Sequence, residues 1–168
     1  IHTEGLVVAT SHLVDVGPVD GFVIRLALGT GSLRWAENVT GSAATSTSVA
    51  DVAVDRWNGR VVVVGHFSGG WVAVGGRVLY PNTGSVPWTP MVGVYQTDGS
   101  VEWARTFSGT GSLGGVAVGG GANTYVGGFY WDAGSLDGIP LPDPAASDAL
   151  VARLGSGGDV NWVRTMGG

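Results

Sequence analysis

Tryptophan, tyrosine and histidine are the side chains through which this sequence could best bind a ligand. Four of its seven tryptophans fall in expected turns or strand edges, where an aromatic ring can stack on a sugar or anchor a protein partner. The candidate binding residues are Trp57, Trp71, Trp88, Trp131, Tyr130 and His66. The simpler alternative is that these rings cover Gly-rich backbone at sheet edges, because isolated surface aromatics are common.

Metal-binding and catalytic sets of residues are incomplete in the sequence. A zinc site needs three or four converging ligands, and only His12 and His66 are candidates, at neighbouring positions near the ends of two similar segments. Asp51 and Asp55 lack the further oxygen ligands of a calcium loop. No Gly-x-Ser-x-Gly turn marks a serine nucleophile. We therefore expect no metal, no cofactor and no catalytic residue, and predict that the chain is not an enzyme.

The composition argues against several classes of partner. The net charge is −5, and the eight arginines are scattered, whereas nucleic-acid binding needs a clustered basic surface. Cysteine is absent, so no disulfide framework is expected. The longest apolar runs, such as 61–64, have the length of strands, which predicts no membrane span. The 31 glycines among 168 residues indicate many tight turns between apolar strands.

A repeat surrounds the other three tryptophans, Trp35, Trp103 and Trp162. In each case a glycine turn precedes alternating apolar and polar residues, and a second alternating segment lies just before that turn. Each such pair of segments predicts a β-hairpin. Two further strands precede the hairpin in the second and third copies of the pattern. The sequence therefore predicts units of four short antiparallel strands, with almost no helix.

The expected fold is all-β, of the β-propeller repeat type, because four-stranded sheets repeated at this length are typical of propeller blades. The expected units are 1–39, a partial blade with the second to fourth strands, 40–107, a second blade, and 108–168, a third blade. Propellers typically have four to eight blades. We therefore expect this chain to be a fragment of a larger propeller or to be completed by other subunits.

The units resemble the bacterial β-propeller repeat family labelled SBBP. The third unit carries the resemblance through a Gly-Val-Ala-Val strand at 115–118, Thr-Tyr-Val-Gly-Gly at 124–128, Asp-Ala-Leu-Val-Ala-Arg-Leu at 148–154 and Gly-Asp-Val-Asn-Trp-Val-Arg at 158–164. The second unit departs from the pattern, with Pro90 in place of the aspartate found at the start of the third strand. The resemblance implies a secreted or cell-surface bacterial protein.

The predicted function is a non-catalytic binding or structural scaffold. Its partner would be a protein, or the remainder of a larger propeller chain, recognised through the long connections 67–89 and 131–147. Loops held on a rigid frame are where recognition usually resides. Two alternatives stay open: a carbohydrate-binding propeller that uses the loop tryptophans, and a hydrolase with two acids at the propeller mouth.

Overall fold

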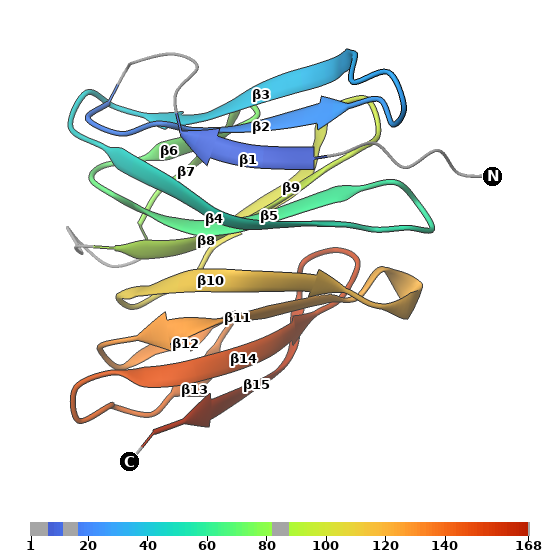
Figure 1. The fold of residues 1–168 in the computed structure, drawn as a ribbon. Helices are drawn as coiled ribbons and strands as arrows, with labels where there is room; N and C mark the ends of the chain where they lie inside the picture. The colour runs from blue at the N-terminus through green and yellow to red at the C-terminus, as the bar shows by residue number, and fades with distance from the viewer. Residues whose placement is uncertain (1–6, 12–16, 82–87, 168) are drawn as a thin grey trace.

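The chain folds into antiparallel β-sheets stacked in layers (Figure 1). A computed structural model describes residues 7–11, 17–81 and 88–167. The all-β class is confirmed, since the one helical element of the described chain is the short 3-10 helix Gly120–Ala122. Within the described ranges no helix has the length and apolar character needed to cross a membrane. That the sheets are blades of a propeller remains a prediction.

Three main sheets follow the order of the predicted units. The first has the strand order β1 (Val7–Ser11), β2 (Gly21–Leu26), β3 (Leu33–Gly41), β6 (Val72–Val74) and β7 (Arg77–Leu79). The second has the order β4 (Ser46–Val54), β5 (Val61–Ser68), β8 (Thr89–Tyr95) and β9 (Val101–Thr106). The third has the order β10 (Gly111–Val118), β11 (Thr124–Tyr130), β14 (Asp148–Leu154) and β15 (Val160–Met166). A separate hairpin joins β12 (Gly134–Leu136) to β13 (Ile139–Leu141).

The position of each strand in the stack explains its sequence pattern. Strand β5 lies in the middle sheet and begins with four consecutive valines, Val61 to Val64, all of which are buried. A strand with packed layers on both faces has no polar side, so its apolar run is continuous. Strand β15 lies at the edge of the third sheet, at the far end of the stack, and none of its residues is fully buried. Polar residues interrupt its apolar ones, as expected for a strand with one face uncovered.

Short hairpins occupy the two connections that were expected to be loops. Strands β6 and β7 leave the second unit and extend the first sheet, with β6 paired to the end of β3. The β12–β13 hairpin approaches the second sheet in a similar way, through a bridge between Ser108 and Ser135. The two-residue turns Gly75-Gly76 and Asp137-Gly138 have positive φ throughout, which is the geometry of the tightest hairpins. Each of these connections therefore ties its unit to the preceding one.

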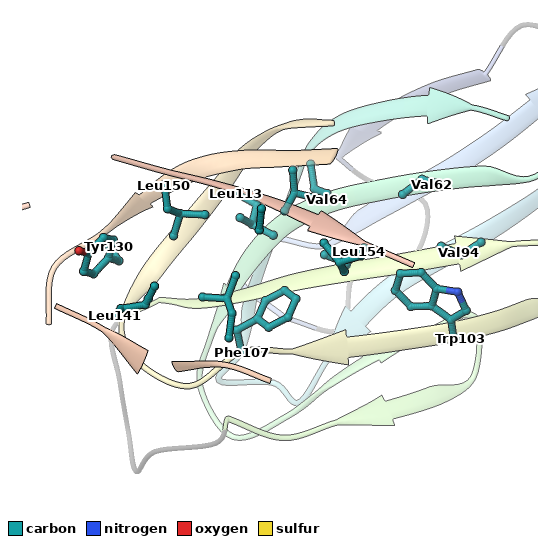
Figure 2. Close-up of a cluster of buried hydrophobic side chains, with 14 residues drawn as sticks. Val62, Val64, Val94, Trp103, Phe107, Leu113, Tyr130, Leu141, Leu150 and Leu154 are labelled. Atoms are coloured by element: carbon teal, nitrogen blue, oxygen red, sulfur yellow. The ribbon is translucent and has the colours of Figure 1, made fainter. Parts of the chain in front are cut away.

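The hydrophobic core consists of two clusters, one at each junction between main sheets. We call these junctions the first seam, between the first and second sheets, and the second seam, between the second and third. Figure 2 shows the second-seam cluster, where side chains from the middle sheet meet side chains from the third. Its labelled members are Val62, Val64, Val94, Trp103, Phe107, Leu113, Tyr130, Leu141, Leu150 and Leu154. The apolar faces of successive sheets are thus buried against one another.

One tryptophan contact is repeated at both seams. Trp35 Nε1 donates a hydrogen bond to the Thr97 carbonyl at 3.1 Å, and Trp103 Nε1 donates to the Ser156 carbonyl at 2.8 Å. Each acceptor lies in the turn between the third and fourth strands of the following unit. Each indole packs against a glycine of that turn with positive φ, Gly99 or Gly158. The repeated tryptophan therefore fastens each sheet to the next.

The third unit has the same local register as the other two. Trp35 lies opposite Arg25, Trp103 opposite Val94, and Trp162 opposite Arg153. A β-bulge follows each of these pairs at the same point of the hairpin. The equivalence of the three tryptophan segments, predicted from the sequence, is confirmed.

Candidate functional site

The second seam brings together aromatic residues that lie far apart in the sequence. His66 is near the end of β5, and Trp88 comes directly before β8, which pairs with β5. Phe129 is near the end of β11, and Trp131 follows that strand. We call these four residues the seam cluster. Because strand ends of two stacked sheets meet here, three residues predicted as binding residues, His66, Trp88 and Trp131, lie in one place.

The rings of the seam cluster form a continuous series of contacts. His66 stacks on Trp88 with ring centroids 4.4 Å apart and an angle of 16° between the planes. Trp88 meets Trp131 edge to face at 5.2 Å, and Phe129 meets Trp131 edge to face at 4.7 Å. Edge-to-face and offset-stacked arrangements are favoured by the charge distribution of aromatic rings. Each ring therefore restricts the orientation of the next.

The backbone around Thr110 and Gly111 holds both tryptophans in position. The Gly111 N–H donates to the Trp88 carbonyl at 2.9 Å, and the Trp131 N–H donates to the Thr110 carbonyl at 2.9 Å. One short segment at the start of β10 thus binds the main chain next to both indoles. These main-chain hydrogen bonds fix the backbone of Trp88 and of Trp131. The sheet itself therefore positions both tryptophans.

Polar groups border the aromatic rings. The Asp132 carboxylate accepts hydrogen bonds from the Thr110 N–H at 2.5 Å and from the Thr110 hydroxyl at 2.9 Å. On the other side, His66 Nδ1 and the Ser112 hydroxyl are 2.8 Å apart. Burial lowers the pKa of His66 below its ordinary value of 6.5, so its ring is neutral at neutral pH. The net charge of the site therefore comes from Asp132.

The seam cluster opens onto solvent. Trp88 is 40% exposed and Phe129 is also exposed, although both make ring contacts. A shallow hollow of about 620 Å³ is lined by Trp88, Thr110, Trp131 and Asp132. Two indoles and one carboxylate around an open hollow can hold the apolar face of a ligand and accept hydrogen bonds at its edge.

The other predicted binding residues lie elsewhere. Trp57 is 63% exposed in the turn between β4 and β5, and Trp71 lies directly before β6. In the described chain, no ring contact joins either residue to the seam cluster. Tyr130 follows Phe129 but points the opposite way and is 2% exposed within the second-seam core. Its position in the core removes it from the surface that a ligand could reach.

Three residues of the site were missed by sequence reasoning: Phe129, Thr110 and Asp132. Phe129 occupies the position in the third unit that His66 occupies in the second, since they share the same place in the strand register. That equivalence could have identified it. Thr110 and Asp132 form the polar edge of the hollow only because the third sheet packs on the second. Their contact carries no local sequence signal.

The histidines and acids considered for metal binding in the sequence do not gather into one group within the described residues. Across residues 7–11, 17–81 and 88–167, no group of three or more His, Asp or Glu side chains could hold a metal ion. His12, one of the two histidines considered for zinc, lies outside the described residues. Burial works to raise the pKa of Asp55, but hydrogen bonds from Trp57, Asn58 and Arg60 lower it overall. A catalytic acid would need the opposite shift.

No protein-family model matches the chain, and no curated protein matches it significantly.

Proposed function

We propose that this chain is a non-catalytic binding scaffold of the β-propeller repeat type, and that it recognises a protein partner through the seam cluster. The resemblance to bacterial SBBP repeats supports an extracellular or cell-surface setting. The proposal rests on the aromatic rings and on their support, since binding surfaces are commonly built from a few aromatic anchors on a rigid frame.

The observation that carries the proposal is the paired fixation of Trp88 and Trp131. Both indoles border the same open hollow, and the backbone of each tryptophan is hydrogen-bonded to the Thr110–Gly111 segment. A pre-positioned aromatic side chain loses little conformational freedom on binding, which favours its use as an anchor. A tryptophan that serves packing alone does not need an exposed indole, since core tryptophans of this chain such as Trp103 are buried.

A peptide library displayed on phage tests the proposal with the folded chain as target. Selected peptides should bind the wild-type chain, and Trp131→Ala and Trp88→Ala should each weaken binding by about tenfold or more, as expected for anchor residues. Trp57→Ala is the matched control, because Trp57 is a more exposed indole outside the cluster. Thermal melting shows whether each variant is folded. Selection of no peptide, or binding that survives both cluster substitutions, would contradict the proposal.

Carbohydrate binding is a second candidate, favoured by the Asp132 carboxylate beside Trp131. Sugar rings present apolar faces that stack on indoles, and their hydroxyls donate to carboxylates. A glycan array probed with the folded chain, followed by titration of tryptophan fluorescence, distinguishes the two candidates. Hits that are lost in both Trp131→Ala and Asp132→Asn would favour sugar over protein. An array without hits would leave the peptide experiment to decide.

A further inference from the structure

The fastening tryptophan occurs three times, but the described chain holds a partner for only two of its copies. Trp35 and Trp103 each donate from Nε1 to a turn carbonyl of the following unit. Trp162 holds the same register position on β15, and no described residue accepts a hydrogen bond from its Nε1. Its ring contacts Tyr125 at 6.3 Å between centroids and the Arg164 guanidinium at 5.9 Å. The indole is thus held in place with its donor unused by the described residues.

The surface around Trp162 has the composition of an interface. Tyr125, Arg164 and Met166 lie on the same outer face of the third sheet, and Met166 is 58% exposed. Aromatic residues, methionine and arginine are enriched in the centres of protein interfaces. The equivalent face of the second sheet is buried against the third, with Trp103 at its edge. The outer face of the third sheet therefore has the form of a seam that lacks its second half.

An arginine beside the tryptophan adds a second hydrogen-bond donor, for which the missing half of the seam must supply an acceptor. At the first seam, Arg25 Nη1 donates to the Gly59 carbonyl at 2.8 Å and to the Thr97 carbonyl at 3.4 Å, the latter being also the acceptor of Trp35. The third unit carries the same cross-strand pair, Arg153 and Trp162. Asn123 Oδ1 holds Arg153 through Nε at 3.2 Å and Nη2 at 2.9 Å. Gly59 and Thr97 lie in two different turns of the second unit, so the arginine and the tryptophan share only the Thr97 carbonyl. The open face thus presents the Trp162 indole N–H and the Arg153 guanidinium as donors.

The first unit carries the corresponding turn at residues 27–32, which is one residue longer than the turns 96–100 and 155–159. Gly31 lies four residues before Trp35, as Gly99 lies before Trp103 and Gly158 before Trp162; its φ is +68°, but no described atom lies within 4 Å of the place where its Cβ would be. Leu28, in the same turn, is 61% exposed. The turn is already closed by hydrogen bonds from Ala27 N–H to the Ser32 carbonyl and from Gly31 N–H to the Ala27 carbonyl. The receiving half of the contact is therefore formed, and the described residues leave it uncovered.

We propose that the outer face of the third unit binds the 27–32 turn of a second copy of this chain. Trp162 then packs against Gly31 of that copy, and Trp162 and Arg153 donate to its turn carbonyls, as Trp35 and Arg25 do within one chain. A second copy is the occupant because the two uncovered surfaces of one chain repeat the two halves of its own seams. The contact is head to tail, so it closes into a ring or continues into a filament, depending on the rotation between copies.

Sedimentation of the folded chain over a range of concentrations tests this proposal. The wild type should associate to multiples of 17.0 kDa. Trp162→Ala and Gly31→Asn should each give a monomer, because one removes the indole and the other fills the space that the indole needs. Asn is chosen because it tolerates positive φ better than other side chains. Trp57→Ala, an exposed indole off both faces, should associate like the wild type.

Mixing the two monomeric variants is the decisive measurement. Gly31→Asn keeps its tryptophan and Trp162→Ala keeps its turn, so an equal mixture has one intact contact and should form a dimer and nothing larger. If Gly31→Asn proves unfolded by circular dichroism, Leu28→Asp replaces it as the variant with a damaged turn.

Three results would overturn the proposal. The wild type could remain monomeric at every concentration, the Trp162→Ala variant could associate like the wild type, or damage to the turn could have no effect while loss of Trp162 does. The last result would indicate a symmetric contact between two Trp162 faces, or another occupant. None of these results bears on ligand binding at the seam cluster, which uses Trp88 and Trp131.

Discussion

The two seams of this protein are built alike at one end and differently at the other. At one end, each has an indole bonded to a turn carbonyl, Trp35 to Thr97 and Trp103 to Ser156. At the other end, the first seam is closed by the buried Thr47 hydroxyl, whereas the second opens into the seam cluster. The shared end is what the repeat needs in order to stack, so the end that differs is the better place to look for function.

At the variable end, the two seams differ in one strand residue and in the residue whose carbonyl it binds. In the first seam, Thr47 accepts a hydrogen bond from the Gly21 N–H at 2.9 Å and donates to the Val39 carbonyl at 2.7 Å. In the second seam, Gly111 holds the same register position and has no side chain to make such bonds. The main-chain bond at this position is kept, since the Thr47 N–H donates to the Val19 carbonyl at 2.8 Å and the Gly111 N–H donates to the Trp88 carbonyl at 2.9 Å; Trp88 thus takes the place of Val19. The repeat has therefore exchanged an internal polar contact for an aromatic surface.

Removal of the fastening indoles tests whether the shared ends of the two seams contribute equally to the stability of the fold. Trp103→Ala and Trp35→Ala should each lower the free energy of unfolding by about 3–5 kcal/mol, as is usual for a large aromatic side chain removed from a core. Both indoles are buried and both lose one hydrogen bond. Chemical denaturation measures the loss. A cost below about 1 kcal/mol for either one, the usual size for a surface substitution, would contradict its role as a fastening residue.

The glycines that receive the indoles should also be sensitive. Gly99→Ala brings a Cβ to 2.9 Å from Trp35 and places alanine at φ of +92°, so steric and backbone costs should add to about 2–4 kcal/mol. Gly138→Ala is the control, because its φ of +81° is also positive but no described atom lies within 4 Å of the place of its Cβ, and it should cost about 1 kcal/mol. Equal losses of stability in the two variants would show that the indole adapts to the extra carbon.

The repeat and the strands could be predicted because their cause is local. Trp35, Trp103 and Trp162 mark equivalent hairpins through spacing and alternation alone, and the structure gives them one register. The seam cluster was only partly predictable. Trp88 and Trp131 were identified as candidates by residue type, but their contact depends on how two sheets stack. Alternation within a strand fixes which face a side chain occupies and carries no information about the partner sheet.

The connections were less predictable than the strands. Residues 67–89 and 131–147 read as long loops, and the structure places hairpins in both. The signal was present in the dipeptides Gly75-Gly76 and Asp137-Gly138, which favour two-residue turns. Strands of three residues are too short to show alternation, however. They are stabilised by pairing with another unit, as β6 is with β3.

Acid pH should weaken the second seam through His66. Burial lowers the pKa of His66 below 6.5, so the unfolded chain takes up a proton in a pH interval where the folded chain does not. The free energy of unfolding should therefore fall as the pH drops through about 6.5. In His66→Phe, which places the third unit's residue in the second, this part of the pH dependence should vanish. Denaturation above and below that pH measures it, and an unchanged pH profile in the variant would exclude His66 as its source.

The smallest effect is expected in the turn between β10 and β11, which is one residue shorter than the corresponding turn between β4 and β5. Ala122 has φ of +61°, whereas Gly59, at the same place in the second unit, has φ of +68°. An alanine in this region is strained, so Ala122→Gly should raise the free energy of unfolding by about 0.5 kcal/mol, the strain relieved being partly offset by the greater freedom of glycine when unfolded. The Ala122 carbonyl accepts from Arg60 Nη2 at 3.4 Å across the second seam, and this bond should survive because the backbone keeps its conformation.

Thermal melting measures the change in stability of Ala122→Gly. Gly59→Ala is the reverse exchange and is expected to destabilise the fold. A destabilised Ala122→Gly variant would show that the Ala122 methyl group, which is buried, contributes more to the seam than its backbone strain costs.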